Sequence, residues 1–235
     1  MATRPDAERR PSGIVVVVAF VVAIGAAVAL IAAALVLRSD SSAPPSPAAG
    51  VDLEGIPQDG TVLGSPAANV TLIEYGDLQC PACRAYTEAV FPSVVTEYVR
   101  PGKVTTEFRG LSFIGPDSER ALRFALAAGL QDRLWNVVEA LYRNQGGENS
   151  GWVTDELVRE LAAAIPGLDV DRMFAEAGST EVTAMIQEAE AYADADEVPG
   201  TPTFFVQIGE AEPYMLESGI GSDELAAALD DALGA

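Results

Sequence analysis

Two cysteines separated by two residues, placed where a strand pattern changes to a helix pattern, constrain this chain more than any other feature. The segment Val70–Tyr75 is mostly apolar and rich in β-branched residues, which predicts a buried strand. After a short loop, Cys80-Pro81-Ala82-Cys83 opens a helical pattern that continues to about residue 98, and Pro92 should bend or interrupt it. Proline is favoured at the first helical position, so Cys80 is expected to be the N-cap and Cys83 to lie one turn in. The sequence thus predicts a strand, a short loop and a helix that begins at a cysteine.

The rest of the globular part predicts a mixed α/β order. Residues 103–111 predict a second strand, and residues 203–208 and 214–216 predict two more. Between them, residues 117–196 have a helical pattern, and Ser222 is expected to cap a terminal helix. The order is therefore β-α-β, a helical block, then β-β-α. Large side chains at helical spacing in the block are expected to belong to the core and not to a cofactor site; they are Trp135, Met173, Phe174 and Met185.

A long uncharged stretch near the N-terminus predicts a membrane span. Residues 14–37 would extend about 36 Å as a helix, enough to cross a hydrocarbon core of about 30 Å. A cleaved secretory signal normally has a shorter apolar region and a small-residue cleavage site, whereas Arg38-Ser39-Asp40 follows here, so an uncleaved signal anchor is favoured. Three arginines precede the span and one follows it. The positive-inside rule therefore places residues 1–13 in the cytoplasm and the rest of the chain outside.

Composition divides the exterior part into a linker and one domain. Residues 38–60 are rich in Ser, Pro, Ala and Gly and are expected to form a flexible tether, with the globular domain at residues 61–235. The whole chain has 14 basic and 35 acidic residues, a formal net charge of −21. A chain this acidic repels polyanions, which excludes nucleic acid as a partner.

The absence of histidine narrows the chemistry. It removes Ser-His and Cys-His catalytic arrangements and imidazole metal ligands. A zinc site at Cys80 and Cys83 would need two more thiolate or imidazole ligands, and the chain has none, so zinc would require two chains to share a site. A purely structural disulfide is the remaining alternative, but a bridge that encloses two residues stabilises little. A redox pair is favoured, because the helix N-terminus lowers the pKa of a thiol placed there.

A second segment, far along the chain, bears on the same site. Val198-Pro199-Gly200-Thr201-Pro202-Thr203 could be an ordinary proline-rich loop between a helix and a strand. Together with the cysteine pair, it suggests a cis peptide at Thr201-Pro202. Such a turn presents the backbone of Thr201 outward, where an extended substrate strand can pair with it.

These segments carry a family resemblance. The string Leu-Ile-Glu-Tyr-Gly-Asp-Leu-Gln-Cys-Pro-Ala-Cys at residues 72–83 and Gly-Thr-Pro-Thr at residues 200–203 resemble the DsbA-like branch of the thioredoxin superfamily. In particular, the chain is similar to membrane-anchored extracytoplasmic thiol–disulfide oxidoreductases of bacteria, over residues from about 61 to 235. The resemblance implies a thioredoxin-like α/β fold with a helical insertion at about 117–196, preceded here by one transmembrane helix.

The resemblance also implies roles for individual residues. Cys80 would be the solvent-facing nucleophile, Cys83 the buried resolving thiol, and Pro202 the cis-proline that faces the disulfide. Glu74 matches an acidic position near the redox pair, where it could relay a proton to or from Cys83; it could equally be a satisfied charge at a strand end. Asp77 is a competing candidate for that relay. Substrate contacts are expected from Thr201, Pro81 and Ala82.

The expected function is disulfide formation in exported proteins with free thiols, without a small-molecule cofactor and by a monomer. The family implies a quinone-linked membrane thiol oxidase as the electron acceptor. Better-known oxidases have histidine between the cysteines, where this chain has Ala82, so we expect a weaker oxidant. Two alternatives remain open: a disulfide reductase or isomerase, and a tethered binding or chaperone module with a structural disulfide.

Overall fold

The computed structural model of the chain describes residues 50–216 and 221–234. The expected cytoplasmic tail (residues 1–13), the expected anchor (residues 14–37) and the linker up to residue 49 lie outside the described residues. No helix within the described ranges has both the length and the apolar character needed to span a bilayer.

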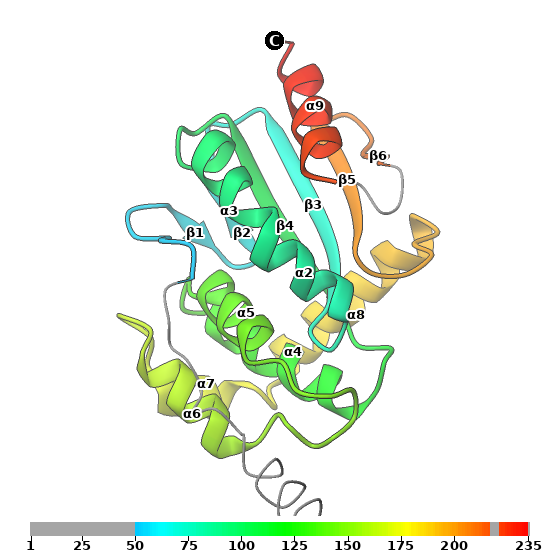
Figure 1. Cartoon of the computed structure of the whole chain (residues 1–235). Helices are drawn as coiled ribbons and strands as arrows, with labels where there is room; N and C mark the ends of the chain where they lie inside the picture. Colours follow the sequence, from blue (N-terminus) through cyan, green and yellow to red (C-terminus); the bar gives the residue numbers. More distant parts are fainter. Residues whose placement is uncertain (1–49, 217–220, 235) are drawn as a thin grey trace, which may run out of the picture. The chain divides into compact units, whose positions relative to one another are not determined.

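A six-stranded sheet forms the centre of the described domain, in the order β1-β2-β4-β3-β5-β6 (Figure 1). The central strand β3 runs parallel to β4 and antiparallel to β5. The predicted strands are confirmed. A short hairpin of β1 and β2, which was not predicted, extends the sheet beside β4. The strands are β1 (Gln58–Asp59), β2 (Val62–Leu63), β3 (Val70–Asp77), β4 (Val104–Leu111), β5 (Thr203–Ile208) and β6 (Tyr214–Met215).

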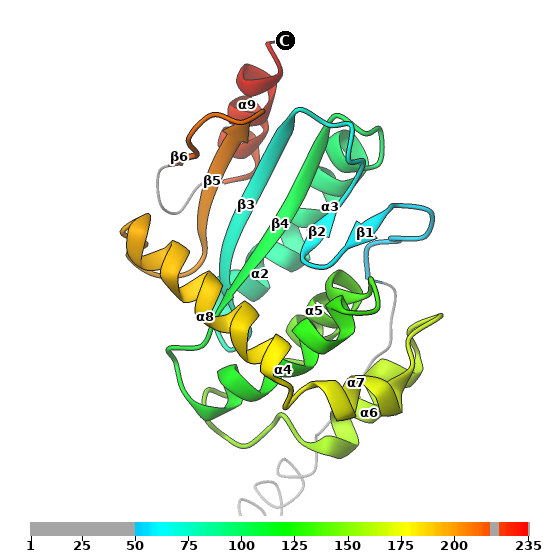
Figure 2. The ribbon, with the colours of Figure 1, turned by 180° about the vertical axis from the view of Figure 1, so that it is seen from behind.

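Helices cover both faces of this sheet, which explains why β3 is buried on both sides. On one face lies the interrupted helix that follows the cysteines: α2 (Pro81–Ala89), α3 (Phe91–Val94) and the π-helix η1 (Val95–Val99). The interruption at Val90, just before Pro92, confirms the predicted break. On the opposite face, α8 (Thr180–Ala195) crosses the strands (Figure 2).

The predicted helical block is a helical insertion between β4 and β5. Besides α8, it contains α4 (Pro116–Gly129), α5 (Leu134–Arg143), α6 (Asp155–Ala163) and α7 (Val170–Glu176). Figure 1 shows α4 to α7 gathered at the carboxyl ends of β3 and β4, where α2 begins. The insertion therefore forms one wall of the region in which the cysteines lie.

An aromatic cluster joins the insertion to the sheet. The Trp135 ring of α5 stacks on Phe91 at a centroid distance of 5.0 Å and meets Phe108 of β4 edge-on at 6.0 Å. Trp135 and Met173 are buried, and the other two predicted core side chains, Phe174 and Met185, pack partly buried against the same core. The predicted core positions are thus confirmed.

Two predictions about the ends of the domain are wrong. Residues 50–60, predicted as the end of the flexible tether, pack against the domain: Leu53 is buried, and Arg100 donates hydrogen bonds to the backbone carbonyls of Asp52 and Glu54. These few contacts fix a segment whose composition alone is that of a linker. At the other end, the N-cap of α9 (Ser222–Leu233) is Gly221 and not Ser222.

Candidate active site

Cys80 occupies the N-cap of α2, as predicted. The chain leaves β3 at Asp77 and turns, with the Cys80 N–H donating to the Asp77 carbonyl at 2.8 Å. The Cys80 backbone is extended, and its sulfur accepts the Cys83 N–H at an N···S distance of 3.5 Å. The local sequence thus places one sulfur at the positive end of the α2 dipole.

Hydrogen bonds stabilise negative charge on Cys80. The Cys83 thiol is the strongest of these donors, and they outweigh the effect of burial, so the pKa of Cys80 falls to about 5. Only 7% of Cys80 is exposed, so the solvent-facing position that the family resemblance implies is reduced here to a small opening.

Cys83 lies one turn into α2, with no exposed surface. Burial raises its pKa above the ordinary value, and the neighbouring Cys80 and Glu74 raise it further. Two sulfurs three residues apart therefore differ sharply in acidity. Such a difference suits a pair in which Cys80 carries the charge and Cys83 holds a proton.

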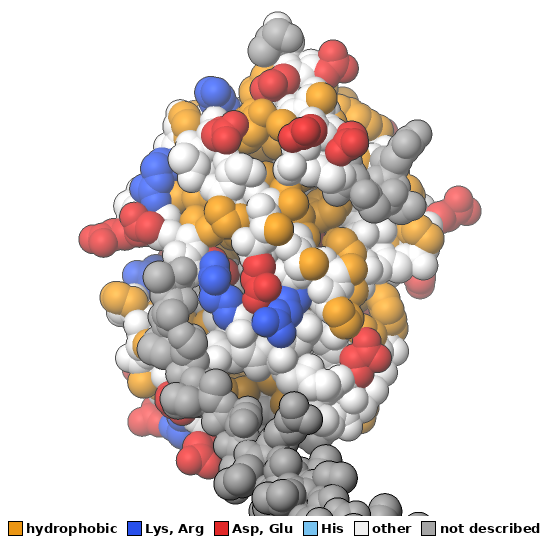
Figure 3. Space-filling model, in the orientation of Figure 1, with side chains coloured by type: hydrophobic (Ala, Val, Ile, Leu, Met, Phe, Trp, Pro, Cys, Tyr) orange, Lys and Arg blue, Asp and Glu red, His pale blue; other side chains and the backbone are white. Residues whose placement is uncertain are grey.

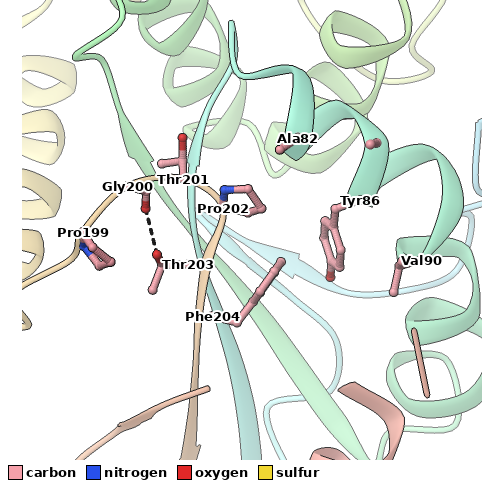
Figure 4. Close-up of a pocket in the computed structure, with 10 residues that line it drawn as sticks. Ala82, Tyr86, Val90, Pro199, Gly200, Thr201, Pro202, Thr203 and Phe204 are labelled. Carbon is pink, nitrogen blue, oxygen red and sulfur yellow. Dashed lines mark hydrogen bonds between the residues drawn. The ribbon is translucent and has the colours of Figure 1, made fainter. Parts of the chain in front are cut away.

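The loop before β5 brings the second predicted segment to Cys80. The Thr201-Pro202 peptide is cis, as predicted, and the Cys80 thiol faces the Thr201 carbonyl at a distance of 3.2 Å. The Thr203 hydroxyl donates to the Gly200 carbonyl at 2.8 Å and fixes the shape of the loop (Figure 4). Antiparallel pairing of β5 with β3 thus joins residues that are 121 positions apart.

A groove of about 580 Å³ opens beside this loop. In Figure 4, the Tyr86 and Phe204 side chains lie close together below Pro202, and their ring centroids are 4.5 Å apart. None of the groove's lining residues is charged: they come from α2 (Ala82, Ala85 and Tyr86), from its C-cap Val90 and from residues 199–204. On the face seen in Figure 3, apolar side chains lie over α2 and β5, and acidic ones gather over α9. The groove can therefore accept an extended apolar segment next to Cys80.

Glu74 lies beneath α2, with 1% of its surface exposed. It lies in the middle of β3, between Phe108 of β4 and Phe204 of β5. Its Oε1 atom has no hydrogen-bond partner among the described residues. Burial, with the charge of Cys80 as a smaller cause, raises its pKa to about 8. Glu74 is thus not a satisfied charge at a strand end, but a buried carboxyl that can hold a proton near neutral pH.

Asp77, the competing candidate, is part of a structural network. Its carboxylate accepts hydrogen bonds from the Ser118 hydroxyl at 2.6 Å, from the Gln79 N–H at 2.9 Å and from the Ile114 N–H at 3.2 Å. With three donors on it, this carboxylate holds together the turn and the start of the insertion and has little hydrogen-bonding capacity left for Cys83. The geometry therefore favours Glu74 over Asp77.

Two residues of the insertion that sequence reasoning did not assign to the site lie against the redox turn. Gln145 donates its amide to the carbonyls of Leu78 and Cys80, at 2.9 and 3.2 Å. The hydroxyl of Tyr142 donates to the Asp77 carbonyl at 3.2 Å. Both residues lie in the predicted helical block at 117–196, and the one signal for Tyr142 is that a buried tyrosine usually has a partner for its hydroxyl.

No cluster of three or more cysteine, aspartate or glutamate side chains that could hold a metal occurs within residues 50–216 and 221–234. The two residues between the cysteines lie at the start of α2. Pro81 and Ala82 are both exposed there, and Ala82 borders the groove. The structure thus gathers every predicted site residue around Cys80 and Cys83.

Known proteins with similar sequences point to a family for this chain. A family model described as thioredoxin matches residues 57–231. A probable disulfide bond formation protein D from Bacillus anthracis is 31% identical over 154 residues, which are 64% of this chain and 71% of that protein.

Solved structures give the same result for the fold. Oxidised BdbD from Bacillus subtilis superposes with a TM-score of 0.66 at 22% identity, covering 77% of this chain and 98% of that one. A thioredoxin-like oxidoreductase from Silicibacter pomeroyi has a TM-score of 0.59 at 30% identity, covering 74% of this chain and 92% of that one.

Proposed function

The chain belongs to the thioredoxin family and is a DsbA-like thiol–disulfide oxidoreductase, and on this premise we propose that it forms disulfides in exported proteins by exchange at Cys80 and Cys83. One observation carries the proposal: the two sulfurs have opposite acidities, with the Cys80 pKa lowered to about 5 and that of Cys83 raised. A low pKa makes Cys80 a good leaving group, which favours release of an oxidised substrate.

The exchange begins with the Cys80–Cys83 disulfide. A substrate thiolate attacks the Cys80 sulfur, a substrate–Cys80 disulfide forms, and the Cys80–Cys83 bond breaks. Cys83 leaves as a thiolate and takes a proton, which Glu74 can supply. The second substrate thiolate then attacks the substrate sulfur of the mixed disulfide, and Cys80 leaves as a thiolate. The substrate loses two electrons and the cysteine pair gains them.

The groove indicates the kind of substrate segment. Since no lining residue is charged, an extended chain with apolar side chains next to its cysteine would fit there. Its backbone would lie along Thr201 and the cis-proline Pro202, and it would contact Pro81 and Ala82 at the helix start. Unfolded exported proteins present such segments before they bury their cores.

Location and partners are part of the same proposal. Residues 14–37 would anchor the chain in the cytoplasmic membrane, with the redox domain outside, where disulfides persist. The domain would act as a monomer and without a bound cofactor. Each turnover leaves the pair reduced, so an electron acceptor is required, and a quinone-linked membrane thiol oxidase fits that need.

The test uses the full chain with Cys80→Ala or Cys83→Ala and an oxidative refolding assay on a reduced substrate protein. Both variants should lose activity, because neither can form the Cys80–Cys83 disulfide. In Cys83→Ala, the Cys80 thiolate can still attack a substrate disulfide and expel one substrate thiolate, and the mixed disulfide should accumulate because no Cys83 thiol remains to displace the bound substrate. If both variants refold the substrate as fast as the unchanged chain, the pair is not catalytic, and a binding module with a structural disulfide becomes the better reading.

A second assay separates the oxidase from an isomerase or reductase. A substrate protein with scrambled disulfides is offered to the reduced and to the oxidised chain. We expect the oxidised chain to act on reduced substrate much faster than the reduced chain reshuffles scrambled substrate. The opposite order of rates would indicate isomerase function. Protease digestion of intact and opened cells then tests on which side of the membrane the domain lies.

A further inference from the structure

Behind Cys83, a hydroxyl and a carboxyl converge on one point above β3. Gly76 packs so closely here that an ideal Cβ on it would lie 3.0 Å from the Tyr142 hydroxyl and 3.2 Å from Glu74 Oε1. The same Cβ would lie 2.7 Å from the Phe108 ring. Only glycine leaves room for both polar groups, so the two side chains share a small space that is closed by an aromatic ring.

Tyr142 also reaches the redox pair. It is fully buried on α5, its hydroxyl donates to the Asp77 carbonyl at 3.2 Å in the turn that leads to Cys80, and Cys83 is one of its neighbours. Burial, followed by the neighbouring Cys83 and Glu74, raises the pKa of Tyr142, so the phenol keeps its proton. A neutral hydroxyl can accept one proton while it donates another.

The exchange reaction needs such a group. When the Cys80–Cys83 bond breaks, Cys83 becomes a thiolate with no exposed surface, so bulk water cannot reach it directly. The buried carboxyl of Glu74 holds a proton but has no hydrogen-bond partner among the described residues. Buried polar atoms rarely stay unpaired, and a short rotation or one water would close the gap to Tyr142.

We propose that Tyr142 relays the proton between Glu74 and Cys83. As Cys83 leaves, the Tyr142 hydroxyl gives it a proton and takes one from the Glu74 carboxyl. Cys83 ends as a thiol, Tyr142 is unchanged and Glu74 becomes a carboxylate, which regains its proton from solvent. When the pair is reoxidised, the proton moves in the opposite direction. This relay rests on the proposed exchange at Cys80 and Cys83.

Tyr86 is the competing hydroxyl in this region. It is buried on α2, its hydroxyl has no partner among the described residues, and the charge of Glu74 affects it. It lines the substrate groove, however, whereas the Tyr142 hydroxyl meets Glu74 Oε1 beside Gly76 and donates to the Asp77 carbonyl in the redox turn. Tyr142 is therefore the hydroxyl placed between the carboxyl and the thiol.

The test compares Tyr142→Phe with Tyr98→Phe in the full chain. Tyr98 is the control, because it is a buried tyrosine remote from the site whose hydroxyl also has acceptors, the Asp230 carboxylate at 3.0 Å and the Ala226 carbonyl at 3.3 Å. The measured quantity is the rate at which the oxidised chain opens its disulfide on mixing with dithiothreitol. We expect Tyr142→Phe to slow this step about tenfold and Tyr98→Phe to leave it unchanged.

Two further readouts separate a relay from a structural role. In a Glu74→Gln background, Tyr142→Phe should slow the step less than twofold, because there is no carboxyl proton left to relay. The thiolate absorbance of Cys80 should titrate as in the unchanged chain, since its donors are Cys83, Thr201 and Ala82 and do not include Tyr142. An unchanged rate in Tyr142→Phe, or an equal tenfold loss in both backgrounds, would overturn the relay. Either result leaves the proposed function standing, because that depends on the Cys80→Ala and Cys83→Ala variants.

Discussion

Cys80 and Cys83 belong to one turn of one helix and yet have opposite environments. Cys80 lies at the N-cap, keeps a small opening to solvent and faces a backbone carbonyl across the groove. Cys83 is sealed between α2 and the insertion, with a buried carboxyl nearby. The difference shows how a fold can give chemically identical groups separate tasks: hydrogen bonds stabilise the charge on one, and burial removes it from the other.

The largest effect that should sharpen this comparison is its pH dependence. The Cys80 pKa is lowered from about 9 to about 5, so ionisation of Cys80 stabilises the folded reduced protein above pH 9, and this contribution is lost as pH falls through 5. The oxidised protein lacks that thiol. We therefore expect the unfolding free energy of the reduced protein, relative to the oxidised one, to rise by roughly 3 kcal/mol between pH 5 and pH 8.

Glu74 acts in the opposite direction in both redox forms. Its pKa is raised from 4.5 to about 8, so its contribution is greatest at low pH and is lost as pH rises through 8. Subtracting the unfolding free energy of the oxidised protein from that of the reduced protein largely removes the contribution of Glu74. Urea titrations of both forms at pH 5, 6.5 and 8 measure the difference. A difference that stays flat across this range would show that Cys80 is not an unusually acidic thiol.

Glu74→Gln should have the next largest effect. Without the carboxyl proton, opening of the disulfide by a substrate thiolate should slow ten- to hundredfold, because general acid catalysis of this kind contributes about that much or more. The pKa of Cys80 should barely change, because Glu74, with a pKa of about 8, is already neutral where Cys80 titrates near 5. Stopped-flow measurement with a reduced substrate gives the rate, and thiolate absorbance gives the pKa.

Glu107→Gln is the matched control for that experiment. Glu107 is a partly buried glutamate of β4 that pairs with Arg109 at 2.8 Å, and it points to the sheet face opposite the cysteines. The control should change stability without changing the exchange rate. Equal rates in the two variants would remove Glu74 from the mechanism.

The smallest effect should come from Ala82→His. Histidine between the cysteines would add a donor for the Cys80 thiolate, stabilise the reduced form and shift the equilibrium with glutathione about tenfold toward stronger oxidation. Ala89→His puts the same side chain on an exposed position at the far end of α2 and should not move the equilibrium. If Ala82→His leaves it unmoved as well, the missing histidine does not weaken the oxidant.

Local sequence pattern was sufficient for part of the site. The strand before Cys80, the helix after it and the break before Pro92 were all predicted correctly, since each depends on neighbouring residues. The cis peptide at Thr201-Pro202 was also predicted correctly. The proline-rich loop alone did not indicate it, but the loop and the cysteine pair together did. The hairpin of β1 and β2 was not predicted, because two-residue strands carry no periodic signal.

Other features depend on contacts between distant residues. Glu74 is a buried acid and not a satisfied charge at a strand end. The strand register decides this, because it places Glu74 between Phe108 and Phe204 under α2. Asp77 is the weaker candidate for the proton relay, because three donors hold its carboxylate. One donor belongs to its own turn, and two come from residues later in the chain.

By itself, the sequence determined the chemistry: two thiols at a helix start, no histidine, and a proline loop to face them. Only the tertiary structure decided how those thiols differ and where a proton can travel between Glu74, Tyr142 and Cys83. The physical reason is that a thiol's reactivity depends on the solvent and charges around it. These are set when α5 packs over α2, and no window of neighbouring residues contains that contact.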